Sequence, residues 1–122
     1  MQQYKKLFND NSYHNTFSNI QRCLRLNDWE EIGDSTHLLT FEMIGLFSFQ
    51  DWTLQKSIDF MWGFLLKLNI KPDYVTIHPD KYNEWKYLYD KYNIEIKCDP
   101  ECIWSDGNTQ GYCTEFYKFD IE

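Results

Sequence analysis

The sequence has little glycine or proline, no long apolar run and no surplus of basic residues. Only 5 glycines and 3 prolines occur among 122 residues, whereas 19% of the residues are aromatic. This composition argues against a disordered chain and predicts one packed globular domain. The longest apolar stretch, residues 60–68, is too short to span a bilayer, and the first residues lack the apolar core of a signal peptide. We therefore expect a cytoplasmic protein without a membrane partner.

Basic residues are outnumbered by acidic ones. Twelve Lys and Arg stand against 19 Asp and Glu, which gives a formal net charge of −7, and the basic residues form no long run. Such a surface repels a phosphate backbone unless its cations gather on one face. We expect weak or no autonomous binding of nucleic acid.

The four cysteines lack the spacing of a metal site. Cys98, Cys102 and Cys113 form a loose cluster in the sequence, with Cys23 far upstream. The cluster has neither a CxxC pair nor a neighbouring His, which a structural zinc site would show. Without a secretory signal, disulfides are also disfavoured. We predict structural thiols and no metal site.

Two stretches have the periodicity of helices, at residues 54–68 and 80–92. In the first, apolar residues at helical spacing predict one stripe facing the core: Ile58, Met61, Trp62, Leu65 and Leu66. Pro79 opens the second helix. The helices should cover one face of a sheet, so the sequence predicts an α+β fold.

The strands are predicted from alternation and β-branched residues. Residues 38–50 and 111–118 should build one antiparallel sheet, and the first of these strands should break at Gly45. The short strands 74–78 and 94–97 should form a parallel edge of their own. Val75 and Ile77 should face the core, and His78 should end its strand facing solvent.

Residues 1–19 are rich in Asn and Ser and carry isolated aromatic residues without a sustained period. We expect an N-terminal arm here with one helical turn, followed by a core domain over 20–122.

The stretch Phe41–Asp51, FEMIGLFSFQD, resembles the second motif region of the alanyl-tRNA synthetases, which are class II enzymes. Other matching positions follow the order of that family: Gln21, Arg22, Cys23, Arg25, Asn27, Asp28, Glu30 and Gly33 before the stretch, and Trp104, Asp106, Gly107, Cys113, Thr114 and Glu115 after it. The resemblance covers residues 20–118. It implies a truncated class II aminoacyl-tRNA synthetase-like antiparallel sheet with flanking helices, because the family's first and third motifs have no counterpart here.

Several site residues follow from this resemblance. It implies a pocket for a small amino acid or its adenylate, lined by Glu42, Phe47, Trp104 and Asp106. For Trp104, a role as a plug at the end of the core is an equal alternative. The resemblance also implies ATP with Mg²⁺ as cofactor, and the candidate phosphate contacts are Arg22, Arg25 and His37.

The sequence departs from the family pattern just before Phe41. There the family carries an Arg that holds the α-phosphate of ATP, followed by a His pair, whereas here Thr36 takes the place of the Arg and His37 that of one His. Fixed positive charge is what adenylyl transfer needs most. Arg22 or Arg25 is the local candidate to replace it.

Three functions follow from the resemblance and this departure. The first is a degenerate paralogue of the catalytic core that binds an amino acid or adenylate without full aminoacylation. The second is a non-catalytic interaction or regulatory module, and the third an active aminoacyl ligase completed by an oligomer or a partner subunit. Because a truncated sheet has open edges, we expect a homo-oligomer or a partner chain to cover them. We also expect weak or no autonomous binding of tRNA.

Overall fold

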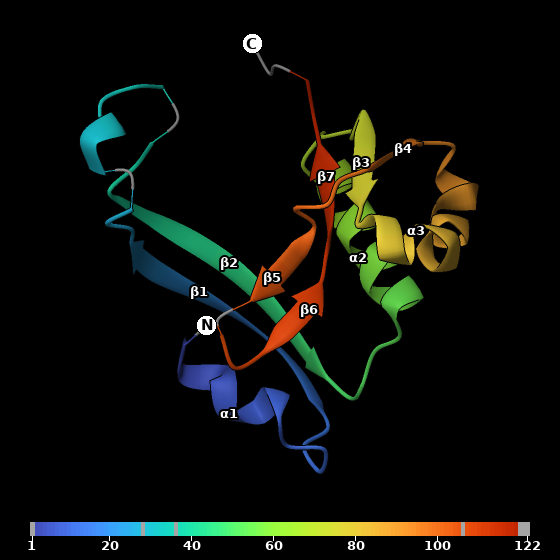
Figure 1. The fold of residues 1–122 in the computed structure, drawn as a ribbon, viewed down its shortest axis with the longest axis horizontal. Coiled ribbons are helices and arrows are strands. Elements are labelled where there is room, and N and C mark those ends of the chain that lie inside the picture. Colours follow the sequence, from blue (N-terminus) through green and yellow to red (C-terminus); the bar gives the residue numbers. More distant parts are fainter. Residues whose placement is uncertain (1, 28, 36, 106, 120–122) are drawn as a thin grey trace. The chain divides into compact units, whose positions relative to one another are not determined.

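The computed structural model describes residues 2–27, 29–35, 37–105 and 107–119. The chain folds as two compact units, with the boundary between Thr53 and Leu54 (Figure 1). It mixes short helices with small sheets, which agrees with the predicted α+β class.

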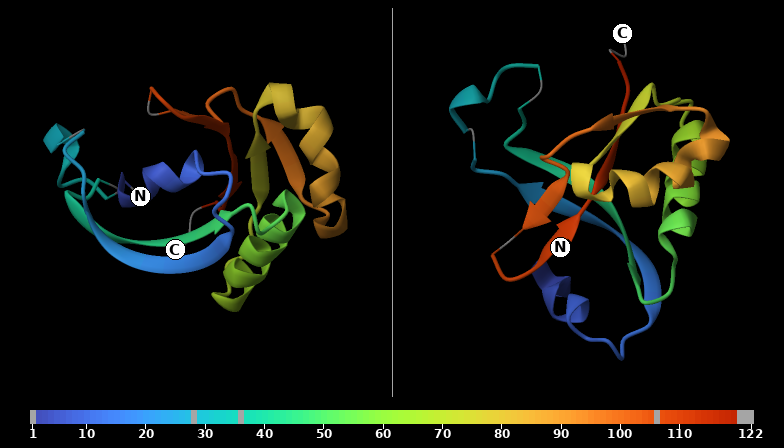
Figure 2. Two further views of the ribbon diagram at one scale, coloured as in Figure 1. Left: turned by 90° about the horizontal axis from the view of Figure 1, so that it is seen from below. Right: turned by 45° about the vertical axis from the view of Figure 1, so that its right-hand side comes forward.

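The first unit is built on a long two-stranded ribbon. β1 (Asn15–Leu24) and β2 (Thr40–Phe49) pair antiparallel over ten residue pairs. Figure 2 shows that the two strands curve together along their length. The described residues of the connecting loop include a short 3₁₀ helix, η2 (Trp29–Glu31). β1 begins inside the stretch 1–19 that we expected to be an arm, and the division at residue 20 stays a prediction.

The ribbon has one aromatic face, as predicted. The segment before β1 forms η1 (Gln2–Tyr4) and α1 (Lys5–Phe8), which pack on this face. The Tyr4 ring lies 4.9 Å from that of Phe17 and 5.0 Å from that of Phe47, measured between centroids. Phe8 contacts Phe49 in the same way, at 5.1 Å. Aromatic edge-to-face contacts therefore hold the N-terminal segment on the ribbon.

β2 runs without interruption through Gly45, so the predicted break is wrong. A Cβ atom at this position would lie 2.6 Å from the ring of Phe47, far closer than any ordinary contact. Gly45 therefore serves side-chain packing, because its missing side chain leaves room for an aromatic ring two residues along the same strand.

The second unit contains a three-stranded sheet in the order β4-β3-β7. The central strand β3 (Tyr74–Ile77) is parallel to β4 (Glu95–Cys98), which confirms the predicted parallel edge, and antiparallel to β7 (Thr114–Tyr117). A separate hairpin consists of β5 (Ile103–Ser105) and β6 (Gln110–Tyr112).

The predicted pairing of residues 38–50 with 111–118 is wrong. β2 pairs with β1, and the C-terminal stretch divides at Cys113 into β6, which pairs with β5, and β7, which pairs with β3. Alternation identified the strands, but it carries no information about their partners.

The predicted helices are present. α2 (Leu54–Lys67) is continuous, whereas the second predicted helix consists of α3 (Pro79–Trp85) and a 3₁₀ continuation, η3 (Lys86–Tyr92). His78 does not face solvent as predicted, because it caps α3: its Nδ1 accepts a hydrogen bond from the Asp80 amide at 3.2 Å. Within the described part of the chain, every helix is too short or too polar to span a bilayer.

The core of the second unit is a single cluster. Ile58 of α2 and Tyr89 of η3 pack with Val75 and Ile77 of β3, so both helical segments cover the same face of the sheet. Val75 and Ile77 are fully buried, as predicted. Met61 is not part of this core, because α2 turns it outward and leaves it 40% exposed.

A partly buried chain of hydrogen bonds joins the core to β7. Thr114 Oγ1 donates to the carbonyl of Thr76 at 2.7 Å, so the Tyr89 hydroxyl must donate to Thr114 Oγ1, also at 2.7 Å. Burial raises the pKa of Tyr89 to about 12, because a phenolate would lose its hydration there. The neutral phenol is thus part of the folded state.

We expect Ile58→Asp to unfold the second unit, because it places an unpaired charge in the core, at a cost of at least about 3 kcal/mol. Met61→Asp, its matched control on the same helix, should melt within a few degrees of the wild type. Thermal melting followed by circular dichroism at 222 nm, a helix-sensitive wavelength, measures both. Equal melting temperatures for the two variants would contradict the orientation of α2 in which Ile58 faces the core and Met61 faces outward.

We expect the stability of the second unit to fall as the pH rises from about 10 to about 12. In this range the unfolded tyrosine loses its proton before folded Tyr89 does, so unfolding becomes more favourable. Urea titrations at pH 9 and pH 11.5 should show a smaller loss for Tyr89→Phe than for the wild type. Tyr87→Phe, which removes the hydroxyl of an exposed tyrosine, should behave like the wild type.

Candidate ligand-binding site

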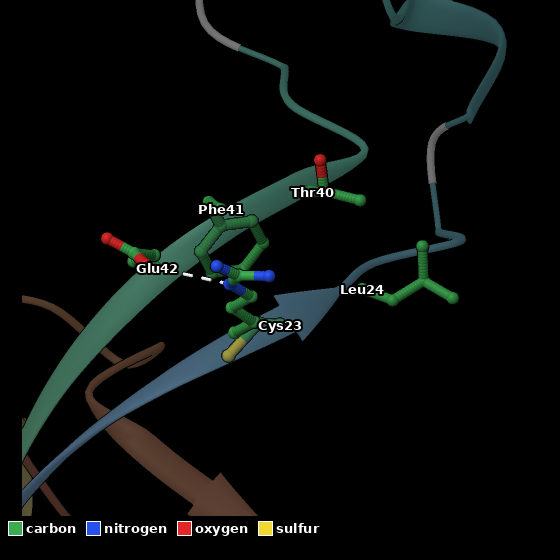
Figure 3. A pocket seen from close by; sticks show the side chains of 6 residues that line it. Cys23, Leu24, Thr40, Phe41 and Glu42 are labelled. Atoms are coloured by element: carbon green, nitrogen blue, oxygen red, sulfur yellow. Dashed lines mark ion pairs between the residues drawn. The ribbon is translucent and has the colours of Figure 1, made fainter.

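A cavity of about 660 Å³ lies at the end of the ribbon where β1 stops and β2 begins (Figure 3). Three consecutive cross-strand pairs line it: Arg22 with Glu42, Cys23 with Phe41, and Leu24 with Thr40. All six residues belong to the first unit, so the strand register alone brings them together.

The charged pair at the cavity is open to solvent. Arg22 Nε lies 3.8 Å from Glu42 Oε1, and the two side chains are 93% and 68% exposed. The dashed line in Figure 3 marks this ion pair, which ends on the labelled Glu42. An exposed pair at this distance contributes at most about 1 kcal/mol. Arg22 can therefore leave Glu42 for an anionic ligand at little cost.

The rest of the lining is mainly apolar. Cys23 and Leu24 come from β1, and Phe41 offers a flat ring from β2. A cation beside an aromatic surface suits a ligand that has both an anionic part and a planar part.

The structure does not test the predicted amino-acid pocket as a whole, because its residues belong to different units, so the pocket stays a prediction. Glu42 and Phe47 lie five residues apart on the continuous strand β2, a separation of about 17 Å along an extended chain. Glu42 lines the cavity, whereas Phe47 packs against Tyr4 and Phe17. Trp104 lies on β5 of the second unit and is 38% exposed. Asp106 lies outside the described residues.

The candidate phosphate contacts differ in their surroundings. Arg22 lines the cavity, whereas Arg25 follows β1, where its amide donates to the Leu39 carbonyl at 3.0 Å. His37 lies between two carboxylates: its Nδ1 is 2.6 Å from Asp34 Oδ2, and its Nε2 is 3.2 Å from Glu31 Oε2. These carboxylates would repel a phosphate, so Arg22 is the best placed of the three.

The ligand atoms of Glu31, Asp34 and His37 lie within 4.8 Å of one another. The contacts of the two His37 ring nitrogens with Asp34 and Glu31 bring these groups together. Thr36, next to His37, lies outside the described residues, so its place opposite the family's Arg stays a prediction.

Sequence reasoning missed four residues of the cavity lining as ligand contacts: Cys23, Leu24, Thr40 and Phe41. The signal that could have found them is the pairing of β1 with β2, because pairing Arg22 with Glu42 also pairs Cys23 with Phe41.

One known protein family matches nearly the whole chain. The family described as tRNA synthetases class II (A) matches residues 1–115. The match includes residues 1–19, which lie upstream of the resemblance seen in the sequence. Both strands that line the cavity therefore lie inside the matched region.

Three similar curated relatives are each named alanine–tRNA ligase. The chain is 40% identical to an alanine–tRNA ligase of Mycoplasma genitalium over 84% of its own length and 13% of the relative's. It is 36% identical to the same enzyme of Desulfitobacterium hafniense, over 80% of the chain and 12% of the relative. For Chlamydia trachomatis serovar D, identity is 35% over 94% of the chain and 15% of the relative. The chain thus spans only about an eighth to a seventh of the length of these relatives.

Proposed function

Because the chain belongs to the class II (A) tRNA synthetases and is related to the alanyl-tRNA synthetase catalytic domain, we propose that it binds ATP or an aminoacyl adenylate at the end of the β1–β2 ribbon. The observation that carries this proposal is the cavity between Arg22 and Phe41, inside the region that matches the family. Its volume, about 660 Å³, is typical of a small-ligand site.

The lining residues suit the two parts of such a ligand. The guanidinium of Arg22 can hold a phosphate through two parallel hydrogen bonds. The ring of Phe41 offers a stacking surface for the purine. Glu42 is the carboxylate among the described lining residues, and a Mg²⁺ ion bound to the phosphates commonly takes one or two such ligands.

Bound ATP would supply the adenylyl group that activates an amino acid. Stabilising that transfer takes several fixed positive charges around the phosphates. Among the described lining residues, Arg22 is the one cation. We therefore propose binding without complete aminoacylation by this chain alone, which is the degenerate-paralogue hypothesis. If a partner supplied further cations around the phosphates, the active-ligase hypothesis would apply instead.

A second candidate, an interaction module, has its own observation. On the ribbon face opposite the aromatic one, the directly paired Ile20 and Ile44 are 68% and 64% exposed, beside Leu46 at 36%. A second copy of the chain could cover this apolar strip and the open edges of the ribbon. We expect a dimer mass in light scattering at micromolar concentration. A monomer mass across the accessible concentrations would remove this candidate.

We expect ATP and a non-hydrolysable alanyl-adenylate analogue to raise the melting temperature of the chain, since a ligand that binds the native state stabilises it. Arg22→Ala should weaken binding about tenfold or more in calorimetry, because it removes a charge-assisted contact. Lys6→Ala removes an exposed positive charge of the same unit outside the cavity lining and should bind like the wild type.

Two outcomes would contradict the proposal. The first is the absence of any melting shift with ATP and with the analogue at millimolar concentration. The second is equal loss of affinity in Arg22→Ala and Lys6→Ala, which would mean nonspecific attraction to charge. Alanine-dependent exchange of pyrophosphate into ATP by the purified chain, if lost in Arg22→Ala or Arg25→Ala, would favour the active ligase.

A further inference from the structure

Cys102 and Cys113 directly flank the β5–β6 hairpin, the two short strands labelled in Figure 1. Ile103 pairs with Tyr112, so Cys102 and Cys113 are the next residues outward on the two strands. The Cys113 amide donates to the Cys102 carbonyl at 3.0 Å, which continues the ladder by one bond. Directly opposed residues of antiparallel strands have Cα atoms about 4.5 to 5.5 Å apart. That spacing lies within the range of about 4.4 to 6.8 Å that disulfides require.

The side chains of this pair also meet. Side chains of directly opposed strand residues point to the same side of a hairpin, and here the Cys102 thiol donates to Thr76 Oγ1 at 3.0 Å. Cys102 is 1% exposed, whereas Cys113 is half-buried. A small oxidant arriving from solvent therefore reaches Cys113 first and finds Cys102 directly behind it.

We propose that Cys102 and Cys113 are a modification site, which a hydroperoxide oxidises to an intramolecular disulfide at the base of the β5–β6 hairpin. This inference does not rest on the proposed function.

The chemistry balances with hydrogen peroxide as the oxidant. The Cys113 thiolate attacks one peroxide oxygen, the O–O bond breaks, and the other oxygen leaves as water after taking up a proton. A sulfenic acid remains on Cys113. The sulfur of Cys102 then attacks the sulfenic sulfur, the S–O bond breaks and a second water leaves. Two electrons pass from the sulfur atoms to the peroxide, and the thiol protons end on water.

The surroundings of Cys113 set the rate of the first step. Burial, with the nearby thiol of Cys102 and the carboxylates of Glu115 and Asp99, raises the pKa of Cys113 to about 11. Because the thiolate is the reactive form, oxidation should be slow at neutral pH and accelerate about tenfold per pH unit until the pH approaches that value.

The disulfide would tie together the ends of the hairpin that carries Trp104. Closing this loop covalently removes conformations from the unfolded chain, so the oxidised protein should melt at a higher temperature than the reduced one.

The test is peroxide treatment of the full chain, followed by thiol titration in denaturant and peptide mapping without reductant. The titrated thiols should fall from four to two, with Cys102 linked to Cys113. Cys113→Ser should form no such bond. Cys102→Ser keeps a hydroxyl donor for Thr76, so it should remain folded, and dimedone should trap a sulfenic acid on its Cys113. Cys23→Ser and Cys98→Ser, the matched controls, should oxidise like the wild type.

If a variant fails to fold, measurements on the wild type alone still test the proposal. Retention of all four thiols up to pH 10 would overturn it, as would a bond that joins Cys98 or Cys23 to either residue. A rate that does not change with pH would overturn the role of Cys113 as the first thiol to react. Oxidation of Cys113 to the sulfinic acid without a disulfide would show that the two thiols do not meet.

Discussion

The register between β1 and β2 is the constraint on which the first unit depends. Ten residue pairs without a bulge fix the face of every side chain, and a slip by one residue would exchange the two faces. This register places Phe17 opposite Phe47, which builds the aromatic face under the N-terminal segment, and Cys23 opposite Phe41 at the cavity. Gly45 supports the same register, because any larger residue would displace the Phe47 ring. Packing and candidate binding site are thus two results of one pairing.

Features with a local cause were predictable from the sequence. The apolar period indicated α2, and β-branched alternation indicated β3 with Val75 and Ile77 buried. Strand partners were not predictable in this way, because pairing depends on contacts between distant residues. The sequence therefore suggested pairing residues 38–50 with 111–118, although β2 pairs with β1. His78 was misplaced for a related reason: a helix cap depends on backbone geometry that strand alternation does not encode.

Of the residues that the resemblance named, some line the cavity and others do not, and their positions along β2 explain the difference. The resemblance named Arg22 and Glu42, and both line the cavity. It also grouped Glu42 with Phe47, which lies five residues further along the same strand and packs against Tyr4 and Phe17. Residue identity can be carried over from a family one position at a time, whereas the shape of a pocket depends on the pairing that brings those positions together.

The acidic character of the chain bears differently on a nucleotide and on tRNA. A net charge of −7 acts on a polyanion through many phosphates and through the summed field of the surface, and that field opposes association. Beyond about 8 Å at physiological salt, however, the attraction or repulsion of exposed charges is largely screened. A single phosphate held against Arg22 lies well inside this distance, where one bidentate contact outweighs charges elsewhere on the chain. The expected weakness of autonomous tRNA binding is therefore compatible with the proposed nucleotide site, and we expect the charge of Arg22, not the net charge of the chain, to decide whether a nucleotide stays in the cavity.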